Sequence, residues 1–113
     1  MLIYEYKLKR GVSMEGLNVN ISSFEEKAEM LKILGHPTRL CMVYGLIEKG
    51  RCNVSTMQER LGLPQSTISQ HLGKLKQAKI VTVERMGLEM FYTVKNPVVI
   101  KLAEALFQEA ISS

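Results

Sequence analysis

The most constraining stretch of the sequence runs from Leu63 to Lys79, where apolar residues recur at helical spacing. Ile68, Leu72 and Leu75 are four and three positions apart, which places their side chains along one face of a helix. No Asp or Glu occurs between residues 60 and 83, although four basic residues lie in that span. Because a solvated helix normally mixes both signs of charge, the open face of this helix is suited to a polyanionic partner.

A second, shorter helix is predicted immediately before this one. Ser55 and Gln58 have the three-residue spacing of a capping box, and Gly62 suits the left-handed residue that ends a helix. Pro64 fits the first turn of the next helix, where its missing N–H is not needed. Two helices joined by a short glycine-containing turn form a helix-turn-helix, whose second helix enters a major groove. We therefore expect Gln65–Gln77 to be a recognition helix.

Periodicity and turn residues predict two helices before this motif, then a β-hairpin and a last helix after it. The first of these helices is opened by capping boxes at Ser22 and Ser23, and the second covers Pro37–Lys49. The hairpin has strands over 80–83 and 89–94 with a turn at Met86-Gly87. The last helix begins after Asn96-Pro97. The expected fold is mainly α with a small β-hairpin, in the order α-α-α-α-β-β-α of a winged helix-turn-helix.

Length and composition indicate one globular domain without a membrane span. The 113 residues are 46% apolar, carry a net charge of +4 and contain no run of 18 apolar residues. We expect residues 1–22 to form an N-terminal arm and residues 23–113 the DNA-binding and dimerisation domain. The N-terminus lacks the basic and apolar regions of a secretion signal, so a cytoplasmic location is expected.

The first and last helices of that domain carry more apolar side chains than one small core can cover. A second copy of the chain would bury them, which predicts a homodimer formed through these two helices. The residues expected at the dimer interface are Phe24, Leu31, Val99, Leu102 and Leu106.

Three segments resemble the ArsR/SmtB family of bacterial winged-helix repressors, within a match over residues 24–108. They are Leu34–Leu40, Gln65–Leu72 with Leu75, and Phe91-Tyr92. The recognition helix, Gly-Leu-Glu in the wing and Asn-Pro before the last helix resemble the metal-less PagR-like virulence regulators of that family. The resemblance implies a homodimer that binds an inverted-repeat operator on double-stranded DNA and releases it when an inducer binds. No residue pattern specifies the inducer.

The recognition helix and the wing supply the side chains expected to contact DNA. These are Ser66, Thr67, Ser69, Gln70, His71, Lys74 and Arg85. The hydroxyl and amide groups suit base edges, since glutamine can pair bidentately with adenine. The imidazole, ammonium and guanidinium groups suit phosphates or the minor groove. His36 precedes a proline at a corner between helices, so it is expected to be a cap or turn residue rather than a ligand.

The metal sites that the resemblance implies for metal-sensing members are absent here. The third-helix region, Ser55 to Leu61, has no thiol in place of Cys-x-Cys, and the last helix has no His or Asp. Its carboxylates, Glu104 and Glu109, would make a poor transition-metal site by themselves. No nucleophile and base are arranged together either. We therefore expect no metal, no cofactor and no enzyme activity.

Two alternatives to a simple repressor remain open. Cys41 and Cys52 are either small inert residues or regulatory thiols of a redox- or sulfur-sensing repressor, as the resemblance implies for some metal-less relatives. Cys41 lies near the positive end of its helix and Cys52 follows Arg51 in an expected loop, positions that favour a thiolate. The other alternative is a winged-helix protein-interaction module that does not read DNA, against which the acid-free helix face argues.

Overall fold

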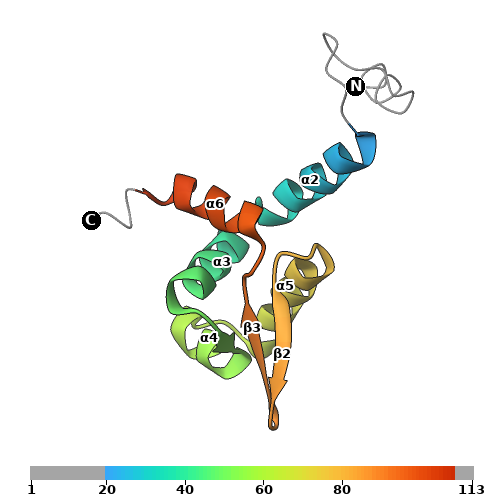
Figure 1. The fold of residues 1–113 in the computed structure, drawn as a ribbon. Helices are drawn as coiled ribbons and strands as arrows, with labels where there is room; N and C mark the ends of the chain where they lie inside the picture. Colours follow the sequence, from blue (N-terminus) through green and yellow to red (C-terminus); the bar gives the residue numbers. More distant parts are fainter. Residues whose placement is uncertain (1–19, 109–113) are drawn as a thin grey trace. The chain divides into compact units, whose positions relative to one another are not determined.

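The structure, a computed structural model, describes residues 20–108 (Figure 1). The expected N-terminal arm, residues 1–22, lies almost wholly outside the described residues, as does Glu109. The described residues fall into two compact units that divide between Lys32 and Ile33.

Helix α2, Ile21–Leu34, spans this division and begins slightly earlier than predicted. Asn20 Oδ1 accepts hydrogen bonds from the Ser22 N–H at 2.9 Å and from the Ser22 hydroxyl at 2.6 Å. The predicted capping boxes at Ser22 and Ser23 were therefore wrong. The asparagine side chain just ahead of the helix satisfies the first amide group, and Ser22 acts as its donor.

Helix α3, Pro37–Lys49, has both of its predicted ends. His36 is its N-cap residue and accepts a hydrogen bond at Nδ1 from the Thr38 N–H at 3.1 Å, which confirms the expected capping role. Pro37 occupies the first helical turn, and Gly50 follows the helix with a φ of 85°. A positive φ of this kind suits glycine, because it carries no Cβ.

The helix-turn-helix consists of α4, Val54–Leu61, and α5, Gln65–Gln77, joined through Gly62 at a φ of 65°. Both helices were predicted, but their caps differ from the prediction. Asn53, not the Ser55–Gln58 capping box, caps α4, because its Oδ1 accepts the Thr56 N–H at 2.9 Å. Pro64 is the extended residue just before α5 rather than part of its first turn.

A three-stranded antiparallel sheet has the order β1-β3-β2, with β1 at Cys52–Asn53, β2 at Thr82–Met86 and β3 at Glu89–Thr93. Strand β1 was expected to be a loop. Two residues carry no periodicity, and they become a strand only because Cys52 pairs with Tyr92 and Asn53 with Phe91 on β3. The hairpin turn lies one residue later than predicted, at Gly87-Leu88.

Helix α6, Pro97–Leu106, begins as predicted at Asn96, whose Oδ1 accepts the N–H groups of Val98 and Val99. The side chains that are almost fully buried are Val43, Ile68, Leu72, Leu75, Ile80, Val81 and Val99. They come from α3, α5, the segment before β2, and α6. The described residues thus form the predicted winged helix-turn-helix with one additional short strand. Figure 1 shows the β2–β3 hairpin extending beyond α4 and α5 as the wing.

Candidate nucleic-acid interface

Helix α5 is held by its apolar stripe, which determines the face that it exposes. Ile68, Leu72 and Leu75 have at most 1% of their surface exposed. Burying three such side chains contributes on the order of 1.5–3 kcal/mol each, so the rotation of the helix about its axis is well determined. The opposite face, with its hydroxyl, amide and ammonium groups, is therefore directed to solvent.

The structure brings six of the seven predicted DNA-contacting residues onto α5. Ser66, Ser69, Gln70 and Lys74 are exposed, whereas Thr67 and His71 are partly buried at the edges of the open face. The seventh, Arg85, is exposed on β2 in the wing. Its Nε donates to the Gly87 carbonyl at 3.1 Å, so the guanidinium lies against the wing tip.

A cluster of three basic side chains joins the start of α3 to α5. Nη1 of Arg39 lies 3.3 Å from Nδ1 of His71, and the rings of His36 and His71 are 4.8 Å apart between centroids. Because a guanidinium can only donate, Nδ1 of His71 must accept, which fixes a neutral imidazole with its proton on Nε2. His36 likewise accepts at Nδ1 from the α3 backbone.

The pKa of His71 is lowered from its ordinary value of 6.5 first by burial, and then by the electrostatic effect of His36, Arg39 and Lys74. Desolvation disfavours the imidazolium, and each positive neighbour disfavours it further. His71 is thus a neutral donor at pH 7. Its Nε2–H is available for a phosphate or a base edge.

Arg39 was not among the residues predicted at the site. Its Nε donates to the Ile33 carbonyl at 2.6 Å, which holds the side chain across the corner before α3 and leaves Nη1 free to reach His71. No spacing rule connects two residues separated by 32 positions. The only signal was that Arg39 belongs to the segment Leu34–Leu40, which carried part of the family resemblance.

Asn53 links the first helix of the motif to the wing. Its Oδ1 caps α4, and its Nδ2 donates to Glu89 Oε1 on β3 at 3.0 Å. Arg51, two residues earlier, places its guanidinium over the Phe91 ring at 5.4 Å from the centroid. These contacts bind the wing to the start of α4.

The residues predicted at a dimer interface have different environments. Leu31 on α2 and Leu106 on α6 have 56% and 57% of their surface exposed, Phe24 is also exposed, and Leu102 is partly exposed. Val99 is only 1% exposed and belongs to the core of its own chain, so it offers almost no surface to a partner, and its place at the interface stays a prediction. Val98, beside it, is the exposed residue instead. Which of these two neighbouring valines faces the core depends on how α6 is rotated about its axis, and tertiary packing sets that rotation.

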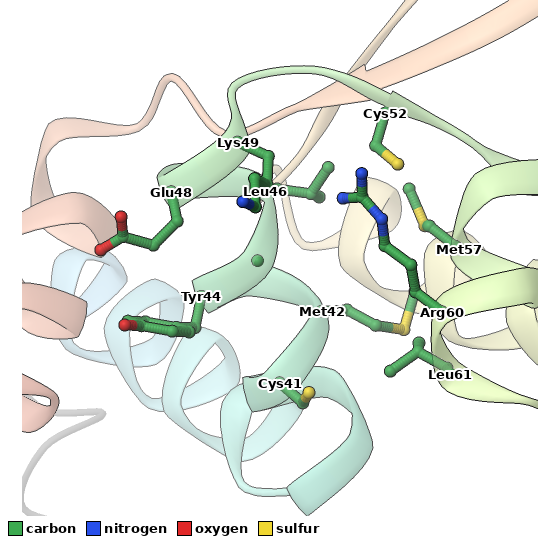
Figure 2. A pocket seen from close by; sticks show the side chains of 11 residues that line it. Cys41, Met42, Tyr44, Leu46, Glu48, Lys49, Cys52, Met57, Arg60 and Leu61 are labelled. Atoms are coloured by element: carbon green, nitrogen blue, oxygen red, sulfur yellow. The ribbon is translucent and has the colours of Figure 1, made fainter. Parts of the chain in front are cut away.

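Both cysteines are free thiols and line one pocket between α3 and α4 (Figure 2). Cys41 is exposed on α3, as predicted from its helical position. Cys52 is buried in β1, and its Sγ lies 3.6 Å from the Asn53 carbonyl oxygen. The expectation that Cys52 occupies a loop was therefore wrong.

Within residues 20–108, no group of three or more His, Cys, Asp or Glu side chains is placed to hold a metal ion. In that same part of the chain, no helix has the length and apolar character needed to cross a membrane.

Comparison with known proteins agrees with this architecture. A protein-family profile described as "Helix-turn-helix domain" matches residues 34–84. The transcriptional repressor PagR of Bacillus anthracis is 42% identical over 79 residues, which cover 70% of this chain and 79% of PagR. The crystal structure of PagR superimposes with a TM-score of 0.73 at 40% identity, covering 77% of this chain and 99% of that one. The HTH-type transcriptional repressor SmtB of Mycobacterium tuberculosis is 44% identical over 64 residues, which cover 57% of this chain and 47% of SmtB. The chain therefore belongs to the ArsR/SmtB family of winged helix-turn-helix transcriptional repressors, and within it resembles PagR.

Proposed function

We propose that this protein is a homodimeric repressor that binds an inverted-repeat operator on double-stranded DNA and blocks transcription there. The observation that carries the proposal is the open face of α5, which presents hydroxyl, amide and ammonium groups and no carboxylate. A helix held by a buried stripe and presenting such a face is suited to the major groove. In this proposal the protein acts in the cytoplasm, has no catalytic activity and needs no metal or cofactor.

The side chains on α5 divide into two roles. Ser66, Ser69 and Gln70 lie where hydroxyl and amide groups can read base edges, and Thr67 supports them at the edge of the face. Lys74, and the Nε2–H of neutral His71, hold phosphates, while Arg85 reaches the backbone or the minor groove from the wing.

A docking module for another protein is a weaker alternative. Such a helix would expose apolar or mixed-charge side chains, whereas the apolar residues of α5 are buried. Regulation through the two thiols is a second alternative. The two thiols differ in their exposure to solvent, because Cys41 is exposed and Cys52 is buried.

Dimerisation is proposed from the unsatisfied apolar surface of α2 and α6. Phe24 and Leu31 on α2, and Val98 and Leu106 on α6, leave large apolar side chains in water. A symmetric partner would cover these side chains. Two recognition helices would then reach half-sites roughly 34–36 Å apart, one turn of DNA.

Binding to the DNA upstream of the protein's own gene, titrated with salt, tests the proposal. Gln70→Ala should relax sequence preference at one position, at a cost of about 1–3 kcal/mol. Lys74→Ala should weaken all sequences alike and lower the salt slope by roughly 1. Lys95→Ala, an exposed lysine just before α6, is the matched control and should change neither quantity. If Gln70→Ala and Lys74→Ala both behave like this control, α5 is not the recognition helix.

A further inference from the structure

A pocket of about 410 Å³ lies between α3 and α4 (Figure 2). It is lined by residues of α3, β1 and α4, none of which was assigned a role in contacting DNA. Its volume falls within the range of roughly 300–1,000 Å³ that is usual for small-molecule sites. The pocket therefore has the size of a ligand site beside the first helix of the DNA-reading motif.

The floor of this pocket is apolar and rich in sulfur. Met42 and Leu46 from α3, Cys52 from β1, and Met57 from α4 are all buried. Thioether side chains are flexible and polarisable, so they adapt to ligands of irregular shape. The floor suits the apolar body of a small organic molecule.

The rim of the pocket is cationic on the side where α4 faces α3. Figure 2 shows the Arg60 side chain extending from α4 toward α3, with Lys49 on the facing helix. Among the described residues, no hydrogen bond or ion pair engages the Arg60 guanidinium. Glu48 also lines the pocket, but in Figure 2 its carboxylate points away from α4. A guanidinium without a partner above an apolar floor suits a carboxylate, which it can bind through two parallel hydrogen bonds.

Gly45 shows that the space beside α3 is open. It lines the pocket from the middle of the helix, and a Cβ added there would meet nothing within 4 Å. Glycine weakens a helix interior relative to alanine or leucine. A larger side chain at this position should therefore stabilise the helix while filling the pocket.

We propose that this pocket is the effector site of the repressor and that its ligand is a small organic monoanion with an apolar body, such as an aromatic carboxylate. The effector role rests on the proposed repressor function. Helix α4 leads into α5 through Gly62, so a ligand inserted between α3 and α4 displaces the recognition helix from its DNA-binding position. Ligand and DNA then weaken each other's binding by the same factor.

Calorimetry on the full-length protein without DNA tests the site, using sodium 2-naphthoate and its uncharged analogue 2-naphthamide. Naphthoate should bind once per protomer and more tightly than naphthamide. Arg60→Met should weaken naphthoate at least about tenfold and leave naphthamide unchanged, because it removes one charge-assisted contact. Arg51→Met removes the same charge outside the pocket lining and should have no effect. Gly45→Leu should abolish binding of both compounds and raise the melting temperature.

The same variants in a DNA-binding titration separate the effector site from the repressor function. Naphthoate should weaken DNA binding by wild type and leave Gly45→Leu unaffected. If naphthoate fails to bind, binds Gly45→Leu equally well, or binds without changing DNA affinity, the effector site is refuted. Equal affinity for naphthamide would refute the preference for an anion, and a destabilised Gly45→Leu would refute the open pocket. If the ligand-free protein does not bind its upstream DNA, the repressor function fails, while the calorimetry still decides whether the pocket binds the anion.

Discussion

Replacing Asn53 with alanine tests how the helix-turn-helix is anchored. The substitution removes the oxygen that caps α4 and the nitrogen that donates to Glu89 on the wing. Loss of an N-cap costs about 1 kcal/mol, and loss of an exposed side-chain hydrogen bond adds about 0.5 kcal/mol. The free energy of unfolding should therefore fall by about 1.5 kcal/mol, which lowers the melting temperature by roughly 5–10 °C in a domain of this size.

Two further substitutions separate the contributions to this loss. Ser55→Ala removes the residue that the sequence pattern designated as the cap. Because the Ser55 side chain is exposed and makes no hydrogen bond with another described residue, the stability should be unchanged or rise by up to about 0.5 kcal/mol. Asn53→Ser keeps a capping oxygen for the Thr56 N–H but loses the amide donor to Glu89, so its stability should fall between wild type and Asn53→Ala.

Urea unfolding followed by circular dichroism measures all three variants. Protein concentration must be held constant, since the stability of a dimer depends on it. If Ser55→Ala destabilised the protein as much as Asn53→Ala, the cap of α4 would be Ser55, as the sequence pattern indicated, and not Asn53. An unchanged Asn53→Ala variant would show that neither contact contributes measurably.

Three other predictions follow from the described contacts. His71 has a folded-state pKa below its unfolded value of 6.5, so its contribution to stability is complete above pH 6.5 and is lost as pH falls through the lower folded-state pKa. Urea unfolding at pH 7.5 and 5.5 should show this loss of stability in wild type. A loss of equal size in His71→Gln would exclude His71 as its source. Replacing Leu102 and Leu106 with lysine should give monomers that bind DNA poorly, whereas wild-type protein sedimenting as a monomer at micromolar concentration would contradict the dimer. Calorimetric titration with Zn²⁺ should reveal no tight site that releases DNA, and a stoichiometric site coupled to release would overturn metal-independent regulation.

Local signals were sufficient for most of the secondary structure. The apolar period of α5, the left-handed Gly62 and the Asn96-Pro97 start of α6 each depend on residues within a few positions of one another. Helix periodicity and helix capping depend on residues a few positions apart, so both can be recognised in the sequence itself. The winged helix-turn-helix and the open polar face of α5 could therefore be predicted from the order of residues alone.

Local sequence signals gave the wrong residue where two neighbouring residues could each fill the same structural role. Asparagine side chains at residues 20 and 53 took the capping roles that the spacing had assigned to serines. Asparagine and serine are about equally good caps, so the backbone conformation at each position made the choice. Val98 and Val99 likewise differ only in which of them the core covers.

The contacts that could not be predicted from the sequence join residues far apart in the chain. Pairing with Tyr92 and Phe91 turns Cys52 and Asn53 into a strand, which in turn lets Asn53 reach Glu89 on the wing. Packing of α3 against α5 brings Arg39 to His71, and the placement of α3 beside α4 forms the pocket that both cysteines line. No periodicity relates such partners, because their proximity arises only when the core closes and burial of apolar surface fixes the helices in place.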